Sequence, residues 1–87
     1  MKVYNFMEEI VREEVDILLA EKEGICKCAK CKLDMMAWAL NRLPPKYVVS
    51  DKGMIFTRLQ GVETQFRADV TIELTKAIAL ISKNPQH

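Results

Sequence analysis

Three cysteines lie within six residues of one another, in the segment Cys26-Lys27-Cys28-Ala29-Lys30-Cys31. This C-x-C-x-x-C spacing lets three thiols face a common centre across one turn, and Cys28 and Cys31 have the spacing of a metal-binding knuckle. The chain has only 87 residues, and a chain of this length buries about 60–65% of its unfolded surface. The sequence therefore favours a single domain over residues 1–87, with a bound ion stabilising the bend at the cysteines.

Zinc is the expected metal, because soft sulfur ligands in a closed tetrahedral site suit it. Cys26, Cys28 and Cys31 supply three ligands, and Asp34, His87 or water supplies the fourth. We expect a structural role, since no acid or base motif accompanies the cysteines. An iron–sulfur cluster is a second metal interpretation, and thiols that bind no metal or are redox-active are the alternative to both. Four lysines surround the cluster and would offset the thiolate charge: Lys22, Lys27, Lys30 and Lys32.

Composition excludes several classes of function. Thirteen basic and 12 acidic side chains leave a net charge of +1, whereas dedicated nucleic-acid binders usually show a clear basic excess. The apolar stretches fall well short of the roughly 20 residues of a membrane span, and the first residues lack the apolar core of a secretory signal. The cysteines are odd in number and bunched, unlike a secreted disulfide framework. We therefore expect a cytoplasmic protein without a membrane segment.

Hydrophobic spacing predicts an all-α fold, a small bundle of three to four helices with a long C-terminal helix. The predicted helices span residues 5–21, 29–41 and 55–81, the last either continuous or hinged near Gly61. Asn5 is the expected N-cap of the first helix, with Glu8 as the capping-box acid. Pro44-Pro45 ends the second helix, and residues 46–49 are expected to form a short extended connection.

Each predicted helix has an apolar stripe with a polar side opposite. The first-helix stripe comprises Val3, Met7, Ile10, Glu14/Val15 and Leu18, and the second comprises Leu33, Met36, Ala37 and Leu40, widened by Met35 and Trp38. The third comprises Ile55, Leu59, Val62, Phe66, Val70, Leu74, Ala77 and Ile81. The acidic side of the first helix, expected to face solvent, comprises Glu13, Glu14, Asp16, Glu21 and Glu23.

The end of the last helix favours a homodimer. Ala77-Ile78-Ala79-Leu80-Ile81 is apolar at five consecutive positions, and five residues in a row point to every side of an α-helix. A small monomer covers one face of a terminal helix, so we expect the other face to pack against a second subunit in a two-fold dimer. An unusually well-buried helix in a monomer is the alternative.

A basic and aromatic elbow follows the second helix, in Asn41-Arg42-Leu43-Pro44-Pro45-Lys46-Tyr47. Two cations and an aromatic ring on a rigid Pro-Pro turn suit a phosphate-bearing ligand. The expected ligand-binding residues are Arg42, Lys46, Tyr47, Arg58 and Arg67, with Gln65 facing the same place. Otherwise Arg42 complements a helix carboxyl end and Tyr47 packs. No nucleotide-loop, zinc-protease or Ser/His/Asp pattern is present, so we expect no enzyme activity.

The whole pattern resembles the ComFB family of late competence development proteins. The resemblance lies in the cysteine cluster, Asp34-Met35-Met36-Ala37, the stretch from Ala39 to Val48, Arg67-Ala68-Asp69-Val70 and Ser82-Lys83-Asn84-Pro85. It implies a small helical homodimer with cysteine-bound zinc and no enzyme activity. Family members are associated with competence or other bacterial signalling, and some are described as receptors for cyclic dinucleotides. Cys26, Cys28 and Cys31 match the family's metal-binding cysteines.

Two functional hypotheses follow. The first is a zinc-stabilised regulatory dimer that binds cyclic di-AMP or cyclic di-GMP near the Pro-Pro elbow. The second is a protein-interaction adaptor without a small-molecule ligand, which docks an unidentified protein partner through a methionine-rich surface. Direct DNA binding is a weaker third hypothesis because the net charge is only +1.

Overall fold

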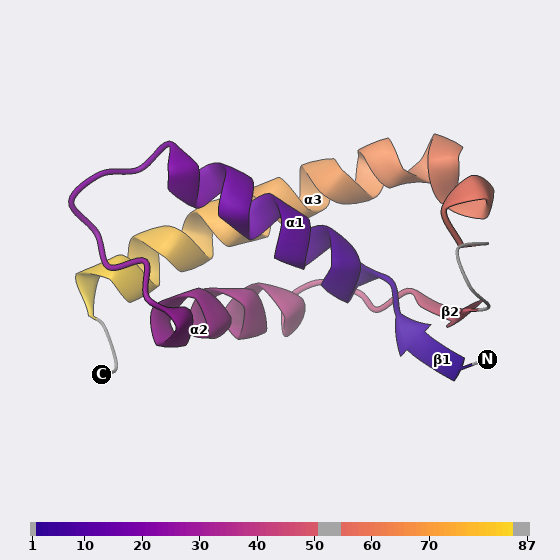
Figure 1. Ribbon diagram of the computed structural model, residues 1–87, viewed down its shortest axis with the longest axis horizontal. Helices are drawn as coiled ribbons and strands as arrows, with labels where there is room; N and C mark the ends of the chain where they lie inside the picture. The colour runs from indigo at the N-terminus through magenta and orange to yellow at the C-terminus, as the bar shows by residue number, and fades with distance from the viewer. Residues whose placement is uncertain (1, 51–54, 85–87) are drawn as a thin grey trace.

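Three helices and a two-stranded sheet make up the fold. The computed structural model describes the backbone of residues 2–50 and 55–84, and the side chains of residues 2–49 and 64–84. The elements are β1 (Lys2–Asn5), α1 (Met7–Ala20), α2 (Ala29–Leu40), β2 (Tyr47–Ser50) and α3 (Ile55–Lys83). Every pair of helices is in contact, and α3 runs the length of the molecule, behind α1 and above α2 in the view of Figure 1. The expected helical bundle with a long last helix is confirmed.

The sheet makes the fold mostly helical instead of all-α. β1 pairs with β2 in antiparallel register, with Val3 opposite Val49 and Tyr4 opposite Val48. Tyr4 and Val48 pack against the core, while Val3 and Val49 are 67% and 51% exposed. The sequence predicted an extended segment at residues 46–49 but placed Val3 on the first helix. β1 was missed because its hydrogen-bonding partner lies more than 40 residues further along the chain.

The start of α1 differs from the predicted cap by one residue. Phe6 is the N-cap and makes no side-chain capping bond. Asn5 instead lies one position earlier, where its Oδ1 accepts hydrogen bonds from the Met7 N–H at 3.1 Å and the Lys46 N–H at 2.8 Å. The Phe6 N–H donates to the Lys46 carbonyl at 2.7 Å. Asn5 therefore ties the start of α1 to the elbow before β2.

The buried faces of α1 and of the described part of α3 follow the predicted spacing, whereas the stripe residues Ile55, Leu59 and Val62 lie outside the described side chains. Both contribute to one hydrophobic core, in which Phe66 and Ile81 are partly buried. The fully buried residues of these two helices include Met7, Ile10, Val15, Val70, Leu74 and Ala77. Leu18 is half-buried, and Glu14, expected on the solvated side, is only 8% exposed. α3 continues unbroken through residue 61, so the single long helix is confirmed.

The predicted inner face of α2 was right in part: Met35 and Met36 are buried and Trp38 and Leu40 pack against the core, but Leu33 and Ala37 do not. Its buried residues are Cys31, Met35, Met36 and Ala39, whereas Leu33 is 59% exposed and Ala37 is exposed. Apolar residues occur all round this helix, so its spacing fits two stripes, and the burial of Cys31 selects the one that contains Met35 and Ala39. The expected methionine-rich surface is also wrong for the described side chains, because Met7, Met35 and Met36 are all buried.

The apolar run near the end of α3 is only partly covered by its own chain. Ala77 and Ile78 are buried and Ile81 is half-buried, but Ala79 is exposed and Leu80 is 52% exposed. The homodimer inferred from this run stays a prediction.

Candidate metal site and the cleft beside Trp38

The cysteine cluster lies where the α1–α2 connection enters α2, near the end of α3 (Figure 1). Gly24 has a φ of +75°, a left-handed conformation that glycine adopts without strain. Cys28 is the N-cap of α2, with extended backbone angles, and its Sγ accepts the Cys31 N–H at 3.4 Å. The turn and the cap together bring the side chains of Cys26 and Cys28 back towards the first turn of α2.

The three Sγ atoms of Cys26, Cys28 and Cys31 all lie within 4.8 Å of one another. In a tetrahedral zinc site with Zn–S bonds of 2.3 Å, sulfur atoms are about 3.8 Å apart. A contraction of about 1 Å or less would therefore bring these sulfurs onto one ion. Cys28 is exposed, Cys26 half-buried and Cys31 fully buried, so the cluster spans from the surface to the core. Its residues fit a zinc ion.

The two cysteines of the knuckle have opposite pKa shifts. The hydrogen bond from the Cys31 N–H lowers the pKa of the Cys28 thiol, with a further contribution from Cys26. Burial raises the pKa of the Cys31 thiol to about 12, and the neighbouring cysteines add to the rise. Cys28 is thus the sulfur most readily ionised for metal binding, while ionised Cys31 needs a bound cation to offset its burial.

The structure does not bring Asp34 into the cluster. Among the described side chains, the group close enough to share a metal ion consists of the three cysteines. The Asp34 carboxylate instead pairs with Lys30, with Nζ and Oδ2 2.6 Å apart. His87, the other predicted fourth ligand, lies outside the described residues.

Three of the four lysines around the cluster, Lys27, Lys30 and Lys32, have oxygen partners. Lys27 Nζ donates to the Lys22 carbonyl, and Lys32 Nζ lies 2.7 Å from Asp16 Oδ1. These contacts keep positive charge around the cysteines, and they bind the lysines to oxygen atoms instead of to the sulfur atoms.

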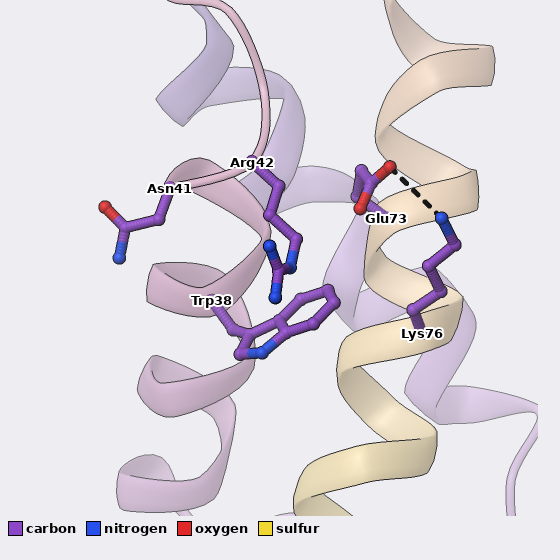
Figure 2. Close-up of a pocket in the computed structure, with 5 residues that line it drawn as sticks. All are labelled: Trp38, Asn41, Arg42, Glu73 and Lys76. Atoms are coloured by element: carbon purple, nitrogen blue, oxygen red, sulfur yellow. Dashed lines mark ion pairs between the residues drawn. The ribbon is translucent and has the colours of Figure 1, made fainter.

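A second feature is an open cleft between α2 and α3, with a volume of about 500 Å³. Trp38, Asn41 and Arg42 line it from the α2 side, and Glu73 and Lys76 from α3 (Figure 2). The Arg42 guanidinium lies over the Trp38 ring, 4.0 Å from its centroid.

Glu73 is the unusual residue of this cleft. Its Oε2 lies 3.5 Å from Lys76 Nζ, but its Oε1 is buried and has no hydrogen-bond partner among the described residues. A buried carboxylate oxygen without a donor is costly. The cleft thus combines two cations, an aromatic ring and a carboxylate, one oxygen of which is buried without a donor in the described part of the chain.

The structure separates the predicted ligand-binding residues. Arg42 lies in the cleft, whereas Lys46 lies over the Phe66 ring at 5.3 Å in a different, smaller pocket. Tyr47 is 65% exposed on β2, and Arg58 has a side chain outside the described part of the structure. Whether any of them binds a ligand stays a prediction.

Arg67 faces α1. Its Nη1 lies 3.2 Å from Glu14 Oε1 and its Nη2 2.9 Å from Glu13 Oε1. Thr71 donates to the other Glu14 oxygen at 2.8 Å. These contacts explain how a charged Glu14 can be buried.

Sequence reasoning missed the roles of Trp38, Glu73 and Lys76 in the cleft. The spacing of Trp38 and Arg42 was a usable signal, because residues four apart on a helix are neighbours. Nothing in the sequence indicated that this pair faces Glu73 and Lys76, since that depends on how α2 packs on α3.

In the described part of the chain, no helix has both the length and the apolar character needed to span a bilayer.

Comparisons with known proteins agree with the fold. The sequence model of the family described as late competence development protein ComFB matches residues 4–85. Competence protein ComFB of Bacillus subtilis (strain 168) is 27% identical over 81 residues, covering 93% of this chain and 83% of that protein. A solved structure of the late competence protein ComFB from Bacillus subtilis matches with a TM-score of 0.79 and 26% identity, covering 98% of this chain and 96% of that one. Because the family model matches nearly the whole chain, this protein belongs to the ComFB family.

Proposed function

We propose that this chain is a non-enzymatic regulatory protein of the cytoplasm that holds structural zinc through Cys26, Cys28 and Cys31 and acts as a homodimer. We further propose that it binds a cyclic dinucleotide, cyclic di-AMP or cyclic di-GMP, in the cleft beside Trp38. The competence-related family supports a regulatory role. The observation with most weight is the convergence of three Sγ atoms within 4.8 Å at the start of α2.

Zinc binding here would join α1, α2 and the core. Cys31 belongs to the hydrophobic core, and Ile25 and Cys26 pack against it. An ion held by all three sulfurs would therefore fix the α1–α2 connection against the helices on either side. Bound zinc would cross-link the three cysteines in a closed site and would take no part in a reaction.

The metal is tested by elemental analysis and by X-ray absorption at the zinc edge on the purified chain. We expect one zinc ion per chain with mainly sulfur ligands, and loss of zinc in Cys26→Ser, Cys28→Ser and Cys31→Ser. Lys27→Ala, which changes the residue between two of the cysteines, is the control and should keep the metal. The proposed zinc site would be contradicted if the purified protein contained no metal, its three thiols titrated freely and it took up no added zinc.

The chemistry of the cleft supports the nucleotide part of the proposal. The Arg42 guanidinium lies over the Trp38 ring, 4.0 Å from its centroid, and an arginine next to an aromatic ring can form a stacking surface for a nucleobase. Arg42 and Lys76 place two positive charges where phosphates would lie.

Calorimetry with cyclic di-AMP and cyclic di-GMP tests this part. We expect binding of one of the two by the unmodified chain, and a loss of about tenfold or more in Arg42→Ala, since a charged hydrogen bond contributes about 1.5–3 kcal/mol. Lys83→Ala, an exposed lysine in the last turn of α3, is the matched control and should bind normally. The absence of heat with either nucleotide at high protein concentration would contradict the proposal.

An adaptor function is the alternative, and the outer face of the sheet favours it. Val3, Tyr47 and Val49 lie on one face of the β1–β2 ribbon and are each more than half exposed. If the protein is an adaptor, the unmodified chain should capture protein partners. Val49→Glu should lose this capture, and Arg42→Ala should keep it.

A further inference from the structure

Cys28 and Cys31 differ sharply in how they can be reached. Cys28 is exposed at the N-cap of α2, while Cys31, three residues later in the first turn, is fully buried. The hydrogen bond from the Cys31 N–H to Cys28 Sγ holds the exposed sulfur directly above that turn. A reagent from solvent therefore meets Cys28 first, and the buried sulfur of Cys31 lies within 4.8 Å beneath it.

We propose that Cys28 is an oxidative modification site, at which hydrogen peroxide converts Cys28 and Cys31 into an intramolecular disulfide and leaves Cys26 a thiol. Cys28 is the residue attacked by the oxidant, and Cys31 is the resolving cysteine.

The reaction balances in two steps. In the first, the Cys28 sulfur attacks one oxygen of hydrogen peroxide, an S–O bond forms, and the O–O bond breaks. The leaving hydroxide takes the thiol proton as water, so Cys28 becomes a sulfenic acid and the peroxide is reduced. In the second, the Cys31 sulfur attacks Cys28 Sγ, an S–S bond forms and the S–O bond breaks. The hydroxide leaves with the Cys31 proton as a second water.

The cap geometry favours the pairing of Cys28 with Cys31, because the hydrogen bond from the Cys31 N–H already holds Cys28 Sγ over the first turn of α2. Residues three apart on a helix have Cβ atoms about 5–6 Å apart, and a disulfide needs a Cβ separation of about 3.5–4.5 Å, so this bond would form after a shift of about 1–2 Å. The backbone at Cys28 is extended, with φ of −69° and ψ of 166°.

Oxidation and metal binding use the same sulfur atoms. A Cys28–Cys31 disulfide removes two of the three thiolates that hold an ion, so the disulfide and the metal exclude each other. This consequence rests on the proposed zinc site, whereas the disulfide itself does not.

Peroxide treatment of the full chain, followed by alkylation with N-ethylmaleimide and mass spectrometry, tests the proposal. The chain has three cysteines; we expect two of the three alkylation sites to be lost together. Because a lysine follows Cys26 and another lies between Cys28 and Cys31, tryptic cleavage places each cysteine on its own peptide. The remaining alkyl group is expected on Cys26. Alkylation at Cys28 or Cys31 instead, or at all three after peroxide, would overturn the proposal.

Variants and the metal state complete the test. Cys26→Ser should still lose both remaining alkylation sites, and Cys31→Ser should leave Cys28 as a sulfenic acid that dimedone traps. If Cys31→Ser yields no dimedone adduct at Cys28, the order of attack is wrong. Metal-free and zinc-loaded protein are compared: faster oxidation without zinc, and zinc release in step with disulfide formation, support mutual exclusion. A disulfide at Cys28–Cys31 in a chain that takes up no zinc would support the modification site and contradict the metal proposal, which separates the two.

Discussion

Glu14 is the buried charged residue of α1, and its partners come from α3. It is 8% exposed, accepts a hydrogen bond from Thr71 and pairs with Arg67. Removing one partner of a buried ion pair leaves a charge that neither water nor protein stabilises. The Arg67 side chain is still 30% exposed, so solvent weakens the ion pair. Its contribution to stability should therefore lie between that of a buried and that of a surface ion pair.

Arg67→Ala should lower the free energy of unfolding by about 1–3 kcal/mol, since it leaves Glu14 without its cation. Urea denaturation measures this loss. Lys32→Ala, which breaks the exposed pair with Asp16, is the control and should change stability by less than about 1 kcal/mol. Equal losses in the two variants would show that the α1–α3 pair contributes no more than a surface contact.

In the metal-free protein, the Cys31 thiol makes the stability of the fold depend on pH. Burial raises the pKa of its thiol from 9.0 to about 12, so the folded state favours the protonated thiol. The resulting stabilisation is fully present below pH 9.0, the pKa of the unfolded thiol, and is lost as the pH rises towards 12. We expect chelator-treated protein to lose stability over this range more steeply than Cys31→Ala. Lysine and tyrosine titrate in both proteins and cancel in the comparison, so parallel stability curves would contradict the assigned burial effect.

At the scale of elements, Asn5 joins three of them. Its Oδ1 accepts from the first backbone N–H of α1 and from Lys46, just before β2. Asn5→Ala removes both acceptor contacts and should destabilise the fold by about 1–2 kcal/mol. Asn5→Asp keeps the oxygen and adds a charge that a helix N-terminus favours, so it should retain most of the stability. Thermal unfolding of the two variants compares them directly, and equal destabilisation would mean that the acceptor does not matter.

The sequence predicted elements better than it predicted their contacts. The spacing of apolar residues located α1 and α3, and Pro44-Pro45 located the end of α2, because these signals are local. It failed for β1 and for part of the inner face of α2, because both depend on partners distant in sequence. Leu33 and Met35 are both apolar, and only packing decides which is buried.

The candidate sites also differ in whether local spacing or contacts between distant segments form them. The three cysteines lie within six residues, so their convergence was predictable from spacing. The cleft beside Trp38 needs Glu73 and Lys76 from another helix. Arg67 was expected beside the elbow but faces α1, because its partner Glu14 lies on the apolar side of that helix.

At the scale of the whole molecule, the exposed apolar residues of α3 indicate where a second copy would pack. The chain measures 38 × 22 × 20 Å, and Ile72 and Leu80 leave more than half of their side-chain surface to solvent on its longest helix. A two-fold dimer that covers Leu80 would add apolar burial to a domain whose own core is small.

We therefore expect light scattering to give a mass of twice 10.0 kDa for the unmodified chain. Leu80→Glu should shift it to the monomer value, because a charge in the centre of an apolar interface loses its hydration without gaining a partner. Thr75→Glu adds the same charge at an exposed position on the same helix and should leave the dimer intact. If Leu80→Glu stays dimeric while Val49→Glu becomes monomeric, the two copies meet at the β1–β2 ribbon and not at α3. A 10.0 kDa particle from the unmodified chain at micromolar concentration would contradict the dimer altogether.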